Sequence, residues 1–401
     1  MRLLIVGAGL VGAAAAHEAQ RLIPGLEVVV IDKNQPGDPN QSTRNSGVIH
    51  QAPYYKPGSL KARYCLEGQT MLREFAAEEN IPIRECGKLI VAVGRDELPR
   101  LDELERRGRA NGTELERIPP EQAREREPYL APCAGALFVK KTAVISFPAV
   151  LEALLRRVRE RGGQVVHRAR LLSCREDGTV ETTRGEWKTD FVVACAGLHG
   201  VGVARILGFQ PRSMILPFRG EYMHLAPEAN HLVRGLIYPV PDPAFPFLGN
   251  HATIGPDGAA HFGPTAVPAT ALEGWRGYNV SPAYLLEALR FPGTWRLFGR
   301  QFRMGLSEIW RSLYFPAFLK SCQGLIPEVR AEWLHPAPEL YGVRAQLVNR
   351  RGEPEMDFVI EERPSRLAVL NAPSPAATAS RRIGLHIASL VQERLGLAQA
   401  H

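Results

Sequence analysis

Three glycines near the amino terminus, Gly7, Gly9 and Gly12, have the spacing of a turn that binds the pyrophosphate of a dinucleotide. In such a turn the first glycine permits a tight bend, and the second lets the backbone approach the phosphates. The third lets the following helix pack closely against the preceding strand. Asp32 lies about twenty residues further on, where a carboxylate can bind ribose hydroxyls. Because NAD and FAD are bound by the same kind of turn, these residues predict a dinucleotide without selecting one.

The hydrophobic pattern predicts the elements that must position these residues. Residues 3–6 are an apolar run typical of a buried strand, residues 10–22 predict a helix, and residues 28–31 predict a second strand. The amide groups at the start of that helix attract phosphates. Residues 191–197 form another apolar run that ends in small residues, so the same domain resumes later in the chain. We therefore predict an α/β fold with a discontinuous Rossmann-type domain.

The composition is that of a folded, basic protein. Among 401 residues, 49 Lys and Arg against 42 Asp and Glu give a net charge of +7, which favours an anionic partner. No nucleic-acid-binding signature is visible, so neither RNA nor DNA is expected. The six cysteines include no Cys-x-x-Cys pair, which argues against a metal site and for a reducing compartment. With neither a signal peptide nor a membrane span visible, we expect a cytoplasmic protein, at most peripheral to the inner face of the cell membrane.

Two domains are predicted, each assembled from separated pieces of the chain. The dinucleotide-binding domain takes residues 1–80, 146–215 and 335–401, and the second domain takes residues 81–145 and 216–334. Apolar and polar residues alternate between prolines over residues 216–263, which favours a mostly antiparallel sheet. The second domain is therefore predicted to be an α+β substrate domain.

Residues 275–330 form a helical stretch in which aromatic residues alternate with arginines. Basic amphipathic helices that carry aromatic residues can lie on an anionic membrane. Because glycine and proline interrupt this stretch, we expect instead a helical subdomain that packs its aromatic side chains into its own core. Peripheral contact with an anionic membrane is the alternative interpretation.

The segment after the second strand favours FAD over NAD. Residues 42–50 contain short polar side chains and a glycine, which can approach both a pyrophosphate and a flavin ring. Residues 192–197 add the small-residue strand end that lies beside the flavin nucleotide in flavoproteins with two dinucleotide folds. No second nucleotide motif for NAD(P)H is visible, so we expect a flavoenzyme that is reduced by its own substrate. No cysteine is marked as a covalent flavin anchor, and we therefore expect noncovalent FAD.

The chain resembles the FAD-dependent D-amino-acid-oxidase-like superfamily and, within it, the branch of the L-2-hydroxyglutarate oxidases and dehydrogenases. The resemblance spans nearly the whole length. It rests on the glycine turn and on residues 44–50, 54–63, 86–92, 217–222, 238–243 and 371–378. The last flavin-binding segment of the superfamily usually contains several glycines, whereas residues 371–378 contain none, which resembles the hydroxyglutarate branch. The resemblance implies oxidation of L-2-hydroxyglutarate, a small dicarboxylate hydroxy acid, to 2-oxoglutarate by hydride transfer to flavin N5. Oxygen or a membrane quinone would accept the electrons.

This oxidation requires a cation for the C1 carboxylate, a second group for the C5 carboxylate and a base for the hydroxyl proton. The resemblance assigns the C1 carboxylate to Arg344, and a guanidinium can bind both oxygens of a planar carboxylate. For the base we favour His50, which ends the flavin-approaching segment, with His251 as its rival. The candidates for the C5 carboxylate, which the sequence does not rank, are Tyr55, Lys56, Arg219 and Tyr238.

Motifs and resemblance together predict a set of FAD contacts. They are Gly7, Gly9, Leu10, Val11, Gly12, Asp32, Lys33, Ser42, Arg44, Asn45, Ser46, Gly47, Leu171, Ala196, Gly197, Pro373 and Ser374. Two other functions compete with the hydroxy-acid oxidase. One is an FAD-dependent amino-acid or amine oxidase of the same fold. The other is a flavin-binding module for RNA modification or a membrane scaffold, although the extra basic domains of such RNA-modifying flavoproteins are not visible here.

Overall fold

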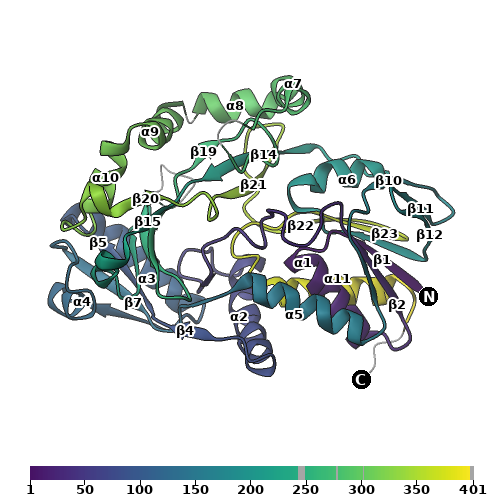
Figure 1. Ribbon diagram of the computed structural model, residues 1–401, viewed down its shortest axis with the longest axis horizontal. Coiled ribbons are helices and arrows are strands. Elements are labelled where there is room, and N and C mark those ends of the chain that lie inside the picture. Colours follow the sequence, from purple (N-terminus) through teal and green to yellow (C-terminus); the bar gives the residue numbers. More distant parts are fainter. Residues whose placement is uncertain (243–248, 277–278, 301, 398–401) are drawn as a thin grey trace.

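A six-stranded sheet forms the base of one half of the protein (Figure 1). The computed structural model describes residues 1–242, 249–276, 279–300 and 302–397, so the last residue of the 238–243 motif lies outside the described residues. The strand order is β22-β23-β13-β1-β2-β9, and every neighbouring pair is parallel except β22 with β23. The strands are β1 (Arg2–Val6), β2 (Glu27–Ile31), β9 (Gln164–Val166), β13 (Phe191–Ala194), β22 (Val359–Arg363) and β23 (Arg366–Asn371). This arrangement confirms the predicted α/β class with a mostly parallel, Rossmann-type sheet.

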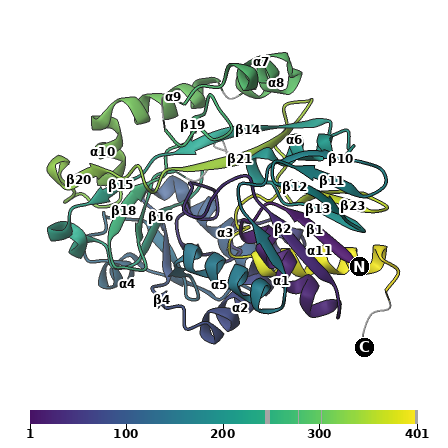
Figure 2. The ribbon, with the colours of Figure 1, turned by 45° about the vertical axis from the view of Figure 1, so that its right-hand side comes forward.

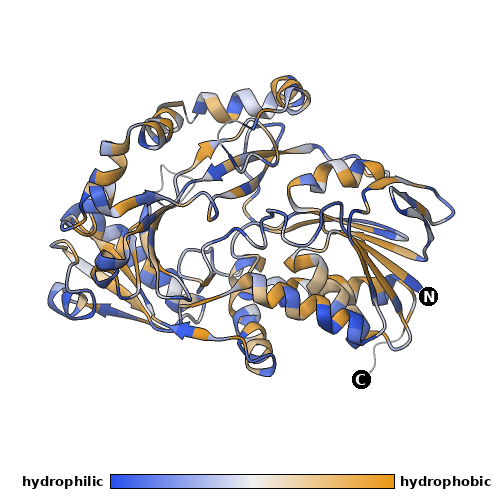
Figure 3. Cartoon of the chain, viewed as in Figure 1, coloured by the Kyte–Doolittle hydropathy of each residue, from blue (hydrophilic) through white to orange (hydrophobic). Residues whose placement is uncertain are grey.

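Both faces of this sheet are covered, as the apolar character of its strands requires (Figure 3). Alternate residues of β1 point to opposite faces, so Leu3 and Ile5 enter one core while Leu4 and Val6 enter another. The first core is covered by α1 (Leu10–Leu22), α5 (Phe147–Glu160) and α11 (Ser380–Arg394), and the second includes residues of α6 (Gly200–Ile206). Helices α1 and α11 lie side by side (Figure 2). A Cβ on Gly384 would come within 2.5 Å of the Ala14 carbonyl carbon, so this glycine permits the close packing.

The other half is built on an eight-stranded sheet with the order β20-β15-β18-β17-β16-β5-β7-β6. Its strands are β5 (Lys88–Ala92), β6 (Leu115–Ile118), β7 (Gly135–Val139), β15 (Met223–Leu225), β16 (Leu236–Pro239), β17 (His251–Ile254), β18 (Ala260–Gly263) and β20 (Leu334–Pro336). All neighbours are antiparallel except β16 with β5. The predicted, mostly antiparallel sheet is confirmed. The parallel pair matters because it places two segments that are distant in the chain at the centre of this sheet.

Two small sheets join the halves. Strand β14 (Ser213–Gly220) pairs with β19 (Val267–Pro268) and with β21 (Gly342–Asn349), and this last pairing places Arg344 opposite Phe218. Strand β8 (Ala143–Ile145) pairs with β4 (Ile83–Glu85) and with β3 (Val48–Ile49), which leads directly to His50. The remaining elements are α2 (Leu60–Glu78), α3 (Leu98–Ala110), α4 (Pro120–Arg126), β10 (Leu171–Cys174), β11 (Thr179–Thr182) and β12 (Gly185–Lys188).

Four short helices form a curved layer (Figure 1). They are α7 (Pro282–Arg290), α8 (Pro292–Arg300), α9 (Phe302–Leu313) and α10 (Phe315–Gln323). In this layer, α7 to α9 lie over the β19-β14-β21 sheet and α10 packs on the eight-stranded sheet. The expectation that this stretch packs its aromatic side chains into its own core is wrong, because Phe318 is buried against the eight-stranded sheet and several other aromatic side chains are exposed. Trp295, Phe302 and Trp310 are 61%, 63% and 59% exposed. The reason is geometric, because a single layer of helices can bury only the face of each helix that meets the sheet.

Candidate functional site

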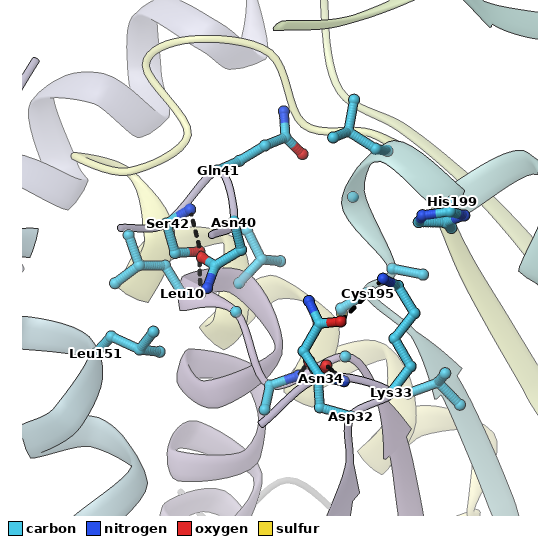
Figure 4. Close-up of a pocket in the computed structure, with 18 of the residues that line it drawn as sticks. Leu10, Asp32, Lys33, Asn34, Asn40, Gln41, Ser42, Leu151, Cys195 and His199 are labelled. Carbon is cyan, nitrogen blue, oxygen red and sulfur yellow. Dashed lines mark hydrogen bonds between the residues drawn. The ribbon is translucent and has the colours of Figure 1, made fainter. Parts of the chain in front are cut away.

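The glycine turn packs against the end of β13 with almost no free space. Gly7 has a φ of +109°, and a Cβ at this position would lie 2.3 Å from the carbonyl oxygen of Cys195. A Cβ on Gly12 would lie only 1.9 Å from the carbonyl oxygen of Gly7. At the start of α1, the Leu10 amide donates to the Ser42 Oγ over 2.9 Å (Figure 4). The turn therefore has the close backbone approach that its sequence predicts.

Asp32 holds the turn and the following loop together. Its Oδ2 accepts a hydrogen bond of 2.7 Å from the Ala8 amide, and its Oδ1 accepts one of 2.8 Å from the Asn34 amide. Each carboxylate oxygen has further acceptor capacity, and Asp32 lines the adjoining cavity. Asp32 thus orders the backbone that surrounds the cavity and can also bind a ligand hydroxyl.

A cavity of about 980 Å³ begins at this turn and runs between α5, α6 and β23. Among its lining residues are the predicted contacts Gly7, Gly9, Leu10, Val11, Asp32, Lys33, Ser42, Leu171, Ala196 and Gly197. The lining, as the described residues define it, lacks the other predicted contacts. These are Gly12, Arg44, Asn45, Ser46, Gly47, Pro373 and Ser374. The volume, the glycine turn and the acid at the end of β2 together fit a dinucleotide such as FAD.

Two of the residues outside the lining have other contacts in the structure. The Arg44 guanidinium donates to the carbonyl oxygen of Pro338 over 3.1 Å and lies 5.9 Å from the centre of the Trp275 ring. Asn45 donates to the carbonyl oxygen of Ser42 over 2.8 Å and accepts from the Gly47 amide over 3.0 Å. These contacts fix the loop that carries Ser42, which itself lines the cavity.

The cavity also contains an ion cluster that sequence reasoning missed. Lys33 donates to Glu273 over 2.6 Å, and the Nε2 atom of His199 lies 3.3 Å from the same carboxylate. The contact with His199, followed by that with Lys33, holds the pKa of Glu273 at about 2 despite partial burial. Glu273 lies far along the chain from the glycine turn and outside any recognised motif, so only the fold places it here.

Beyond the cavity lies a second group of side chains, which we call the polar cluster. It consists of His50, Tyr54, Lys88, Tyr238, His251 and Arg344. The Tyr238 ring stacks on the His251 ring with a centroid distance of 3.8 Å and an interplanar angle of 26°. The Lys88 Nζ atom lies 5.0 Å from the centre of the Tyr238 ring. Ala345, the neighbour of Arg344 on β21, lines the cavity, so β21 contributes one residue to the cavity wall and the next to the polar cluster.

Both predicted histidines belong to the polar cluster and are neutral at pH 7. Burial, together with the nearby charges of Lys88, His251 and Arg344, lowers the pKa of His50 to about 3. Burial also lowers the pKa of His251 to about 3, although its bond to Gly249 opposes this shift. The His251 Nδ1 atom donates to the Gly249 carbonyl oxygen over 2.9 Å, which leaves Nε2 as an unprotonated acceptor.

Arg344 provides the half-buried cation of the polar cluster that the resemblance implies. Burial lowers the pKa of its guanidinium, while Tyr222, Tyr238 and Glu308 act in the opposite direction. An arginine stays protonated even when its pKa is lowered, because its ordinary pKa is above about 12. A cation of fixed charge therefore acts electrostatically on two neutral imidazoles.

The structure separates the four candidates for the second carboxylate. Arg219 donates to Glu221 over 3.0 and 2.7 Å, so its charge is already compensated. Lys56 is exposed, and Tyr55 forms a side-chain hydrogen bond with Ser374. Tyr238 lies in the polar cluster itself. Lys88 was missed, although it lies within the 86–92 motif, because an apolar strand pattern surrounds it.

Comparisons with known proteins agree with this geometry. The model of the family "DAO: FAD dependent oxidoreductase" matches residues 2–390. L-2-hydroxyglutarate dehydrogenase of Escherichia coli (strain K12) is 38% identical over 396 residues, which cover 98% of this chain and 93% of that protein. The mitochondrial L-2-hydroxyglutarate dehydrogenase of Caenorhabditis elegans is 38% identical over 411 residues, with 98% and 94% covered.

Solved structures share the fold at lower identity. L-α-glycerophosphate oxidase from Mycoplasma pneumoniae, determined with FAD bound, superposes with a TM-score of 0.77 at 21% identity, covering 98% of this chain and 94% of that one. Glycine oxidase from Geobacillus kaustophilus superposes with a TM-score of 0.72 at 20% identity, covering 98% and 95%. At these identities the likeness establishes the fold alone.

Proposed function

Because the chain belongs to the DAO family of FAD-dependent oxidoreductases, we propose that it oxidises the hydroxyl carbon of L-2-hydroxyglutarate to give 2-oxoglutarate. Its cofactor is FAD. The relatives that carry the name L-2-hydroxyglutarate dehydrogenase support this substrate. The structural observation that carries the proposal is the polar cluster, where Tyr238 stacks on His251 and the charge of Arg344 acts on both neutral imidazoles.

Two residues of the polar cluster have definite tasks in this reaction. FAD, when bound, supplies the acceptor for the hydride. Arg344 holds the C1 carboxylate through parallel N–H···O bonds, which fix the orientation of C2. The unprotonated Nε2 of His251 accepts the hydroxyl proton, and its bond to Gly249 keeps the ring in the required tautomer. The fixed tautomer favours His251 over His50 as the base, which reverses the preference drawn from the sequence.

Anaerobic reduction of the flavin tests the proposal directly. The purified holoenzyme is mixed with L-2-hydroxyglutarate, D-2-hydroxyglutarate, glycine or sarcosine, and the flavin absorbance is followed. We expect bleaching by the L-enantiomer alone. Bleaching only by the amino acids would establish the competing amine oxidase, and no bleaching by any small acid would favour a binding module. Adding oxygen or a soluble quinone afterwards shows which of the two proposed acceptors reoxidises the flavin.

Replacing His251 by asparagine is expected to lower kcat about 100- to 10,000-fold, because the amide cannot accept the hydroxyl proton as a base. The same change at His50 is expected to alter kcat less than the change at His251. Stopped-flow measurement of flavin reduction at saturating substrate separates the two variants. If His50→Asn has the larger effect on kcat, His50 is the base and His251 is not.

The pH dependence of the wild-type enzyme provides an independent check on the base. Because burial lowers the pKa of both histidines to about 3, the base loses activity by protonation only as the pH approaches that value. We expect kcat/KM for flavin reduction not to fall between pH 7 and about pH 5, where substrate carboxylates stay ionised. An acid limb with an apparent pKa near 6.5 would show that the base is an imidazole outside this buried environment.

We also infer that the outer face of α8–α10 lies on an anionic membrane surface. Trp295, Phe302 and Trp310 are more than half exposed, and Leu313 is 79% exposed. Arginine and lysine side chains are exposed on the same layer of helices, at Arg290, Arg296, Arg300 and Lys320. An apolar face flanked by basic residues suits the boundary between anionic headgroups and acyl chains. No helix among the described residues has both the length and the apolar character to cross a membrane.

Vesicle co-sedimentation at low salt tests this contact. The wild type is expected to sediment with phosphatidylglycerol vesicles and not with phosphatidylcholine vesicles. Combined Trp295→Ser, Phe302→Ser and Trp310→Ser substitutions should leave the protein in the supernatant while the flavin is still reduced. Leu172→Ser with Met356→Ser, at exposed apolar positions on other elements, is the matched control. A wild type that stays wholly in the supernatant would rule out the contact.

A further inference from the structure

Lys88 is a buried lysine without a hydrogen-bond partner. It begins β5, is 1% exposed, and its Nζ atom has no acceptor within the described part of the chain. A lysine ammonium is almost never buried without a partner, because removal from water disfavours the charge. Such a group destabilises the folded protein unless a ligand supplies the missing partner.

The surroundings of Lys88 indicate what kind of ligand that is. Its Nζ atom lies 4.6 Å from the centre of the Tyr54 ring and 5.0 Å from that of Tyr238, and both rings favour a cation. The Tyr54 hydroxyl is also buried without a partner among the residues described. Tyr238 in turn stacks on His251, so the ammonium lies one aromatic ring away from the proposed base. A cation and a hydroxyl donor thus converge at the edge of the polar cluster, which suits a carboxylate.

We propose that Lys88 binds the distal carboxylate of the substrate and so selects dicarboxylates over monocarboxylates, an inference that rests on the proposed oxidation of a hydroxy dicarboxylate. Arg344 is assigned to the C1 carboxylate, so the distal carboxylate needs another cation. Arg219 is compensated by Glu221, and Lys56 is exposed. Lys88 is buried, unpartnered among the described residues and beside the base, which are the three properties that this role requires.

Proton uptake gives the proposal a signature that a packing role lacks. Burial lowers the pKa of Lys88 to about 7, so near neutral pH part of the population is uncharged. A carboxylate bound beside the amine favours its charged form, so binding takes up a proton above pH 7. The titratable side chains coupled to or packed against the amine are His50, Tyr54, Cys65, Cys86, Tyr238 and His251.

The test compares two substrates of equal length, L-2-hydroxyglutarate and L-2-hydroxyvalerate, which differ in the distal carboxylate. In Lys88→Met the KM for the dicarboxylate is expected to rise about 100-fold, whereas the KM for L-2-hydroxyvalerate stays within a few fold. Lys88→Arg should keep the preference for the dicarboxylate. Lys140→Met, at an exposed lysine of the same half, is the matched control. An equal rise in KM for both substrates, or a fall in kcat at unchanged KM, would show that Lys88 does not select dicarboxylates.

Calorimetric titration of the holoenzyme with glutarate separates this inference from the proposed function, since glutarate cannot be oxidised. At pH 7.5 the wild type should take up a proton on binding, visible as a dependence of the heat on the buffer, and Lys88→Met should bind about 100-fold more weakly. If the wild type fails to oxidise L-2-hydroxyglutarate yet shows this uptake, the function is wrong and the carboxylate site stands. If Lys88→Met does not retain FAD, the proposal is tested instead by the proton uptake of the wild type and by the substrate preference of Lys88→Arg. Glutarate binding without proton uptake would overturn the proposal.

Discussion

Replacing Arg344 by methionine is expected to raise the KM for L-2-hydroxyglutarate about 1,000-fold, because the buried C1 carboxylate would lose its charged partner. Methionine retains much of the length of the side chain, so the fold of β21 should survive. Lys88 would still attract the dianion, so binding is weakened and misoriented rather than abolished. We therefore also expect kcat to fall, since C2 would no longer be held beside the base and the flavin.

Steady-state kinetics with a quantified flavin content checks this result. Arg344→Lys should give an intermediate KM, because an ammonium keeps the charge but loses the parallel bonds of a guanidinium. Arg350→Met, at an exposed position just beyond β21, is the matched control and should behave as the wild type. An Arg344→Met enzyme with an unchanged KM would show that the carboxylate binds elsewhere.

Replacing Gly12 by valine is expected to lower the affinity for FAD at least about 100-fold and to lower the melting temperature. The reason is the 1.9 Å that would separate a Cβ at this position from the carbonyl oxygen of Gly7. That obstacle is backbone, not the end of a flexible side chain, so the glycine turn itself must move. Moving it displaces Gly9 and Asp32, which line the cofactor cavity.

Flavin absorbance per protein after gel filtration, together with thermal unfolding, checks this expectation. Gly299→Ala is the matched control, because a Cβ at Gly299 on α8 would meet nothing within 4 Å. That variant should retain FAD and be as stable as the wild type or slightly more so. A Gly12→Val protein that purifies with a full complement of FAD would contradict the assigned role of the turn.

Most of the dinucleotide-binding half could be predicted from local pattern. The glycine spacing, the helix over residues 10–22 and the strand before Asp32 are confirmed by β1, α1 and β2. Each of these predictions depends on residues within a few positions of one another, where turn sterics and hydrophobic period act directly. The identity of the cofactor followed from the resemblance and is supported by the family match.

The stretch at residues 275–330 shows where local pattern was not enough. The composition and pattern of this stretch indicated helices correctly. They could not indicate that the helices lie in one layer on a sheet, and this arrangement exposes Trp295 and Trp310. Burial depends on what covers an element, and that is a property of the whole fold.

The sequence by itself determined the cofactor turn, the class of the fold and, through resemblance, the assignment of Arg344. Only the tertiary structure decided that Arg219 is compensated by Glu221, that His251 has a fixed tautomer and that Lys88 is buried between Tyr54 and Tyr238. Strands β5 and β16 are far apart in the chain and meet only because they pair in the eight-stranded sheet. Electrostatic environment is set by such long-range pairing, because desolvation and charge proximity depend on distance in space rather than along the chain.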